Sequence, residues 1–276
     1  MVLIAVPWVC AQSSPWNLTL DSSFRMEFLF GTQAVRDRTP LQDIERFRID
    51  SHFRLPVLAG NVEMTPLVFL SGRLGGLTSF LEQQGTVDRS AADFDIQVAE
   101  RRVINAKPSF SGWEAAGLFH LWNDGGYRFS VTAGYREEYW KLEGEDQAQT
   151  SFLSENFQTR VPFLGLQTAV FFPWWKARFE LIGSRWMTKI VSGSLTNSFL
   201  AQYEAKATGG GLLELQVEGT ASITQNIFAG LHSRYTFQES FGELIRKGNL
   251  RPPDLPLELY MGDSFLLVGV DLTVAF

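Results

Sequence analysis

Cysteine and histidine are scarce in this sequence. One cysteine among 276 residues leaves no partner for an intrachain disulfide, a cysteine-based metal site or a c-type haem link. The three histidines, His52, His120 and His232, show no metal-ligand spacing, and no Ser-His-Asp order is apparent. We therefore expect no metal, no cofactor and no disulfide framework.

Positive charge is also in short supply. The 24 Lys and Arg residues against 30 Asp and Glu give a net charge of -6 and an isoelectric point near 5.2. The chain thus has no global positive field that would attract nucleic acid. We expect no nucleic-acid partner.

Long hydrophobic runs are missing as well. A mean hydropathy of -0.03 excludes a bundle of membrane helices, whose spans would raise the average. The one continuous apolar run, residues 1–11, is shorter than the about 20 residues that a spanning helix needs. It fits the apolar core of a signal peptide cleaved after Ala11, and a lipid attached at Cys10 is the alternative.

Aromatic residues are abundant, at 13% with 23 Phe and 8 Trp, and they lie in alternating patterns. In residues 46–55 apolar or small residues alternate with charged residues or His, a period of two that is typical of a β-strand. The same period occurs at 24–30, 127–136, 227–237 and 266–276. Such stretches exceed the about 5–6 residues of an average strand. They fit transmembrane β-strands of about 9–11 residues, with apolar side chains toward lipid and polar ones toward the lumen.

Turn residues set the number of strands. Short turns containing Gly, Asn or Pro are predicted at 58–61, 123–126, 173–176 and 224–226. Longer polar stretches are predicted as external loops, with both chain ends periplasmic: 34–43, 75–108, 143–153, 193–209 and 240–261. The ten strands then lie near 16–33, 44–57, 62–74, 109–122, 127–142, 154–172, 177–192, 209–223, 226–240 and 263–276.

The predicted fold is therefore all-β, a ten-stranded antiparallel transmembrane β-barrel formed by residues 12–276. The alternating stretch 92–103 is interpreted as a hairpin extending above the membrane, because one more membrane strand would make an odd total. A membrane strand at 92–103 remains the alternative.

Other features of the sequence point to the outer membrane. Aromatic residues near the predicted strand ends fit the interfacial girdles of a barrel: Trp113, Trp122, Tyr127, Trp140, Trp174, Trp175 and Tyr235. The final alternating strand ends in Phe276, which resembles the C-terminal signature by which bacterial outer-membrane barrels are recognised for insertion. We expect a monomer in the outer membrane of a Gram-negative-type bacterium, with the barrel-insertion machinery as a partner.

The polar face of the predicted strands carries many charges. In a narrow bore these groups would pair with one another and plug the lumen: Arg25, Glu27, Arg46, Arg48, Asp50, His52, Arg54, Glu114, Arg128, Arg136, Arg178, Glu180, Glu214, Glu218, Arg234 and Asp271. The histidines are interpreted as partners in this network rather than as general bases. A narrow pore is the alternative.

Four short segments carry a family resemblance: GYR at 126–128, AGYRE at 133–137, PFLGL at 162–166 and ITQN at 223–226. The first three resemble the strands that lead to and from the third external loop of omptins, the ten-stranded outer-membrane proteases. The fourth resembles a late periplasmic turn of that family. The resemblance covers about residues 109–240 and the C-terminal strand.

This resemblance implies an endopeptidase that cuts between basic residues and needs lipopolysaccharide. It also implies an Asp-x-His dyad in the fourth external loop, opposite an Asp-x-Asp pair in the second. Asp93 and Asp95 form such a pair in the second predicted loop and would be the catalytic carboxylates. The fourth-loop stretch 192–204 contains no Asp and no His, so the dyad is missing.

Omptins also share a lipopolysaccharide-binding patch on the outer wall of the barrel. Two of its positions match this sequence, while Tyr139 stands where the family has an arginine. Basic side chains nearby would supply cations for the lipid phosphates. The patch implied by the resemblance comprises Tyr135, Glu137, Lys141, Arg185 and Lys189.

Taken together, the sequence favours a non-proteolytic surface protein with a structural, adhesive or binding role and a plugged lumen. Its external loops would be the working surface, with a protein or peptide as the ligand. An omptin-like endopeptidase that uses Asp93 and Asp95 is the alternative, and a narrow pore is the third.

Overall fold

The computed structural model describes residues 16–38, 45–79, 86–93, 98–146, 152–195, 202–247 and 257–275. In this part of the chain no helix is long and apolar enough to cross a membrane. The predicted signal peptide 1–11 with Cys10, and the terminal Phe276, lie outside the described residues. The described strands are β1 (Trp16–Arg38), β2 (Glu45–Leu67), β3 (Leu70–Ser79), β4 (Thr86–Asp93), β5 (Val98–Asn123), β6 (Tyr127–Asp146), β7 (Phe152–Phe171), β8 (Trp175–Ser184), β9 (Thr188–Leu195), β10 (Gln202–Ser222), β11 (Ile227–Lys247) and β12 (Leu257–Ala275).

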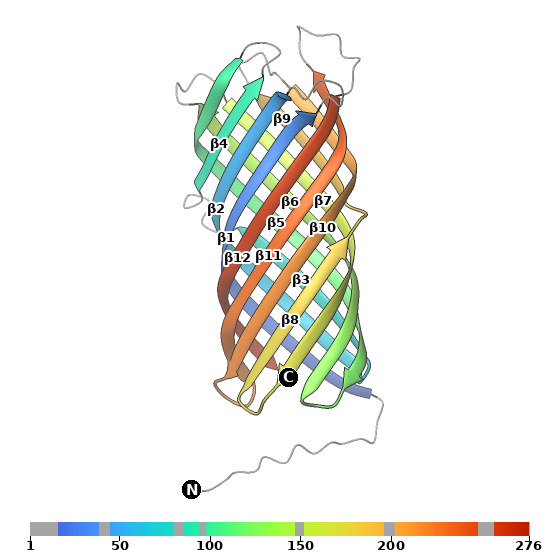
Figure 1. Cartoon of the computed structure of the whole chain (residues 1–276). Coiled ribbons are helices and arrows are strands. Elements are labelled where there is room, and N and C mark those ends of the chain that lie inside the picture. Colours follow the sequence, from blue (N-terminus) through green and yellow to red (C-terminus); the bar gives the residue numbers. More distant parts are fainter. Residues whose placement is uncertain are drawn as a thin grey trace, which may run out of the picture.

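These strands fill ten positions of one closed antiparallel sheet (Figure 1). β3 and β4 share a position, because both pair with β2 on one side and with β5 on the other. β8 and β9 likewise share the position between β7 and β10. β1 pairs with both β2 and β12, which closes the sheet into a barrel. The predicted fold, an all-β ten-stranded antiparallel barrel, is confirmed.

Short connections gather at one end of the barrel, where β1 also begins and β12 ends (Figure 1). The predicted turns at 123–126, 173–176 and 224–226 lie at this end. The predicted turn at 58–61 is wrong, because β2 runs through it and pairs without interruption with β1. Gly60 is one more extended residue of this strand, since Glu63 continues the buried face and Val62 the exposed face. The chain instead turns at residues 68–69.

The strands extend much further at the other end than predicted. β1, β6, β9, β10, β11 and β12 all enter stretches that were predicted as loops. Most of the predicted loop 75–108 is barrel wall formed by β3, β4 and β5. Residues 92–93 lie in β4 and residues 98–103 in β5, and these two strands pair antiparallel, with Arg89 opposite Val103, so that they prolong two barrel positions; residues 94–97 lie outside the described residues. The hairpin interpretation of this stretch therefore agrees with the observed pairing.

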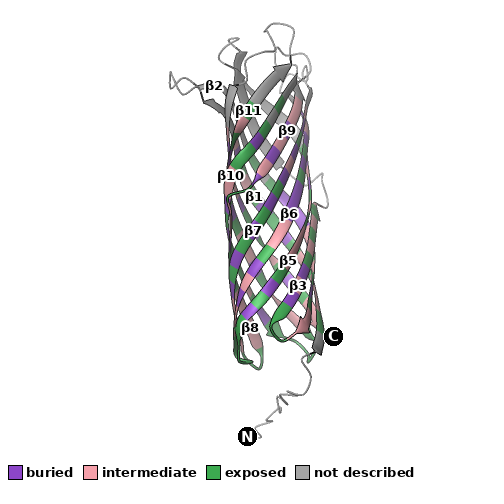
Figure 2. Cartoon of the chain, turned by 90° about the vertical axis from the view of Figure 1, so that its right-hand side faces the viewer, coloured by how far each residue is buried: buried purple, intermediate pink, exposed green. Residues whose placement is uncertain are grey.

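Polarity is reversed between the two halves of the barrel. Near the short turns, Phe24 and Val270 point outward, each 55% exposed, while Glu27 and Asp271 point inward and are buried. In the other half, apolar side chains such as Leu55 fill the interior. Figure 2 shows buried and exposed residues alternating along the strands. The first half thus has the arrangement of a lipid-embedded barrel, and the second has that of a water-exposed barrel with an apolar core.

This reversal corrects part of the predicted lumen. His52 and Arg54 lie outward and exposed on β2, although the sequence pattern placed them inside. The side chains of Arg46, Arg48 and Asp50 lie outside the described residues. The other inward predictions are confirmed by buried or half-buried positions on the inner face.

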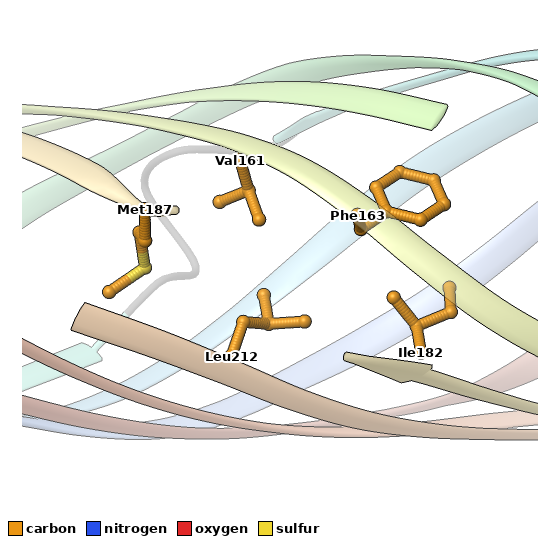
Figure 3. Close-up of a cluster of buried hydrophobic side chains, with 5 residues drawn as sticks. All are labelled: Val161, Phe163, Ile182, Met187 and Leu212. Carbon is orange, nitrogen blue, oxygen red and sulfur yellow. The ribbon is translucent and has the colours of Figure 1, made fainter. Parts of the chain in front are cut away.

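Aromatic and aliphatic side chains pack across the interior of the second half. Trp140 lies between Phe110 and Phe265, with ring centroids 4.2 Å and 5.3 Å away. A second cluster joins β7, β8 and β10 with the segment before β9, and Figure 3 shows its members: Val161, Phe163, Ile182, Met187 and Leu212. The prediction of Trp140 as a girdle residue is wrong, because its ring is in this core and only 8% exposed.

Exposed aromatic residues mark the two borders of the lipid-facing zone. Trp122, Tyr127 and Trp174 are exposed at the short-turn end. Trp113 and Tyr235 are exposed where the outer wall changes from apolar to polar. Trp175 is half-buried and stacks on Phe172 at a ring distance of 4.4 Å. These positions fit interfacial girdles.

Candidate functional site

The interior of the lipid-facing half contains a tight ion-pair cluster. Arg73 donates to Glu180 at 2.6 Å and to Glu114 at 2.8 Å. Arg136 donates to Glu114 at 2.6 Å and to Glu214 at 2.5 Å. These residues come from β3, β5, β6, β8 and β10, and all five are buried or nearly so. The two guanidinium groups thereby tie strands together from opposite sides of the lumen.

A looser cluster of charged residues lies beside the first one in the lumen, with members from β1, β8, β10, β11 and β12. Arg25 lies 3.8 Å from both Glu27 and Asp271, while His232 lies 2.7 Å from Glu27. Arg178 is 3.9 Å from Glu218. A cavity of about 50 Å³ between the two clusters is lined by residues of both. This volume has room for ordered water rather than for a larger solute.

Toward the short turns the lumen contains the Arg128–Glu63 ion pair, with its charged atoms 3.3 Å apart, and a hydrogen-bonded chain around His120. His120 lies 2.7 Å from the hydroxyls of both Ser71 and Ser130, and Ser71 lies 2.9 Å from Thr65. Both ring nitrogens of His120 thus face hydroxyl groups, and among the described residues no carboxylate hydrogen-bonds to the ring, so this arrangement lacks the third member of a catalytic triad.

Above the aromatic core, Lys189 forms a buried ion pair with Asp263. The same ammonium lies 5.8 Å from the ring of Phe157. Glu155 is fully buried nearby on β7, and burial raises the pKa of its carboxyl well above the usual range. Lys189 is therefore an interior residue, and its prediction as part of an outer-wall lipopolysaccharide patch is wrong. Its position on β9 is shifted to the inner face by the break between β8 and β9, which the sequence did not predict.

The carboxylates predicted as catalytic lie at the end of the barrel remote from the short turns. Asp93 is the last residue of β4 and pairs with Phe47 and Val98. Asp95 lies outside the described residues. The stretch 192–204 joins β9 to β10 on the other side of the barrel, with β5, β6 and β7 between β4 and β9 on the shorter way round. The described ends of this stretch, in β9 and β10, thus lie across the barrel from Asp93, and the sequence of the stretch contains no Asp and no His.

The outer wall carries a hydrogen-bonded cluster just above the apolar zone. Glu137 accepts hydrogen bonds from Gln158 at 2.6 Å and from Arg160 at 2.8 Å. The hydroxyl of Tyr139 and the Arg160 guanidinium hold the pKa of Glu137 below its usual range. Tyr135 lies below this cluster and contacts Trp113 at a ring distance of 5.5 Å.

Two further predicted patch residues lie apart from that cluster. Lys141 is exposed and pairs with Glu143 at 2.8 Å. Arg185 is exposed in the segment between β8 and β9. Gln158 and Arg160 were not predicted from the sequence, although both stand on an alternating strand next to the predicted patch. The inward-facing Glu63 and Arg73 were not predicted either, and the same period of two could have identified them.

Comparison with known proteins supports the fold. No protein-family model matches the sequence, and no curated protein matches it either. Among solved structures, the chain is similar to the outer membrane protease OmpT from Escherichia coli, with 12% sequence identity and a TM-score of 0.82. That match covers 94% of this chain and 97% of the other. The translocator domain of the autotransporter NalP from Neisseria meningitidis matches with 8% identity over 94% of this chain and 89% of the other, at a TM-score of 0.41. The chain therefore has the fold of an outer-membrane β-barrel of the OmpT type.

Proposed function

We propose that this chain is a Gram-negative outer-membrane protein that keeps an omptin-like barrel without omptin proteolysis and serves as a surface binding or structural protein with a plugged lumen. The filled interior is the observation that carries the proposal. From the short-turn end, the lumen contains the His120 chain, the Arg73 and Arg136 clusters, the Trp140 stack and the Lys189–Asp263 pair.

Each of these layers opposes passage of a solute. Moving the ion pairs aside would leave buried charges unpaired, which is strongly unfavourable. Opening the aromatic layer would forfeit close packing. Among the described residues, a cavity of about 50 Å³ lies between the charged clusters, which is room for water. A narrow pore is therefore the weaker alternative.

In this proposal the protein has no general base for proteolysis. Water attack on a peptide bond needs a group that accepts a proton near the reacting atom. His120 and His232 are buried in the lipid-facing half, and His52 lies on the outer wall of β2. Asp93 and Asp95 would remain the catalytic carboxylates only if another group on the opposite wall replaced the missing dyad.

Lipopolysaccharide is the proposed lipid partner of the outer wall. The half-buried Tyr135 and the exposed Trp113 would lie at the membrane border, with Arg160, Lys141 and Arg185 available for phosphate groups. Glu137 orients Arg160. External protein or peptide ligands would bind at the loop end of the barrel.

Ion conductance across planar bilayers tests the plugged lumen. Refolded protein should give no current steps above those of the bare bilayer, because the interior layers exclude a continuous water path. A variant with both Arg136→Ala and Glu114→Ala, if it is heat-modifiable and therefore folded, should stay closed as well, because the Trp140 stack and the Lys189–Asp263 pair still fill the lumen. Current steps from the unaltered protein would contradict the proposal.

A further inference from the structure

Two rows of side chains, polar except for Ile190, cross the outer wall above the lipid-facing zone. They stand on β5, β6, β7 and β9, and Figure 2 labels each of these strands. The lower row is formed by residues directly opposite one another across the strands: Ser111, Tyr139, Gln158 and Ile190. The upper row has the same relationship: Ser109, Lys141, Asn156 and Ser192.

A groove lies within these rows. It has a volume of about 300 Å³ and is lined by all eight residues together with parts of Trp140 and Phe157. Such a volume reaches the lower end of the roughly 300–1,000 Å³ found for small-molecule sites. The hollow is explained by side-chain size, because Ser109, Ser111 and Ser192 are short and flank the longer Tyr139, Lys141 and Gln158.

The side chains of the groove are held in place by the cluster below. The Gln158 amide donates to Glu137 at 2.6 Å and to the Tyr139 hydroxyl at 3.2 Å. Arg160 donates to the same carboxylate at 2.8 Å. Fixing the amide and the phenol before binding reduces the entropy lost when a ligand is ordered. The floor of the groove is therefore preorganised.

The chemistry of the groove favours hydroxyl-rich ligands. Its lining offers serine hydroxyls, two amides and a phenol, all of which can both donate and accept hydrogen bonds. The ring of Tyr139 is 41% exposed and adds an apolar surface. Lys141 is offset by Glu143 at 2.8 Å, so this part of the wall has little net charge.

We propose that this outer-wall groove binds a short neutral saccharide. The inference rests on the proposed surface-binding function and names a ligand class for it. Hexose units match the lining because their hydroxyls pair with the serines and amides while a sugar face packs on Tyr139. Because this part of the wall has little net charge, the ligand is a free neutral glycan rather than the anionic sugar core of lipopolysaccharide.

The test is saturation-transfer NMR with titration calorimetry on refolded protein in a zwitterionic detergent, because sugar-headed detergents would compete. The probe is maltotriose, and an anionic deacylated core oligosaccharide from lipopolysaccharide is the contrast. Ser111→Trp fills the groove from an exposed position. Thr32→Trp is the matched control, because Thr32 is an exposed hydroxyl residue on the outer wall of β1.

We expect maltotriose to bind, and Ser111→Trp to weaken that binding at least tenfold while Thr32→Trp leaves it unchanged. Binding of the core oligosaccharide alone would contradict a neutral ligand. No binding by heat-modifiable protein, or equal binding by Ser111→Trp, would overturn the inference. The proposed function is tested separately: it fails if the unaltered protein conducts ions across a bilayer or cleaves the dibasic peptide.

Discussion

Lys189 on β9 forms an ion pair with Asp263 on β12, although β10 and β11 lie between these strands in the barrel wall. Both side chains are only 2% exposed. The pair therefore joins separated parts of the wall through the interior. It lies among apolar side chains such as Phe157, where an unpaired charge would be unfavourable.

Removing one partner of this pair should destabilise the barrel. Lys189→Ala leaves the Asp263 carboxylate buried without its cation, and we expect the free energy of unfolding to fall by about 3–5 kcal/mol. Urea unfolding in micelles measures it. Lys141→Ala is the control, because its exposed pair with Glu143 should contribute no more than about 1 kcal/mol. A loss of that small size for Lys189→Ala would show that the interior pair contributes little.

Truncating the central ring of the aromatic stack should also be strongly destabilising. Trp140→Ala removes contacts with Phe110 and Phe265 and leaves a cavity, so the free energy of unfolding should fall by about 3–5 kcal/mol. Trp122→Ala changes an indole that is 60% exposed and should have a smaller effect. Equal effects of the two variants in urea unfolding would argue against an apolar core in this half.

The turn before β6 should respond to acid through Asp124. Hydrogen bonds from the Trp122 indole and from the backbone amides of Tyr127 and Gly126 lower the pKa of this carboxyl below its usual 3.8. The carboxylate therefore stabilises the turn fully above pH 3.8, and this contribution is lost as the pH falls through the lower folded pKa.

NMR of the Trp122 indole proton follows this titration, because the indole donates to Asp124 at 3.2 Å. Its chemical shift should change with a midpoint below pH 3.8, whereas Asp124→Asn should give a flat profile. A midpoint above 3.8 would mean that these hydrogen bonds do not favour the charged form.

The reversal of polarity predicts which end of the barrel is outside the cell. In a Cys10→Ser background, Lys141→Cys should react with a membrane-impermeant thiol reagent on intact cells, and Asn123→Cys should react only after lysis. Both positions are exposed in the structure. Labelling of Asn123→Cys alone on intact cells would invert the proposed topology.

The sequence was most informative where lipid dictates the pattern. Phe24, Glu27 and Asp271 could be assigned to faces because apolar residues must meet lipid and charges must meet the lumen. His52 and Arg54 show the same alternation, but they lie beyond the membrane, where this rule does not apply and the apolar face of the strand points inward. Their assignment failed for that reason.

Connections and long-range pairs were harder to predict. The turn at residues 68–69 is Val-Phe and lacks the Gly, Asn and Pro signals of tight turns. The break between β8 and β9 contains Arg185, Trp186 and Met187, again without such a signal. Lys189 and Asp263 are 74 residues apart, and only the barrel register brings them together. The outer-wall groove likewise depends on the register of four strands.

Cleavage of an internally quenched dibasic peptide reports directly on whether this barrel is an omptin-type protease. The assay uses heat-modifiable refolded protein with lipopolysaccharide present, beside a variant carrying Asp93→Ala and Asp95→Ala. We expect no cleavage above the buffer rate for either protein, because the stretch 192–204, whose ends in β9 and β10 lie across the barrel from Asp93, contains no Asp and no His. Cleavage by the unaltered protein that is lost in the variant would contradict it and identify an endopeptidase with a different base.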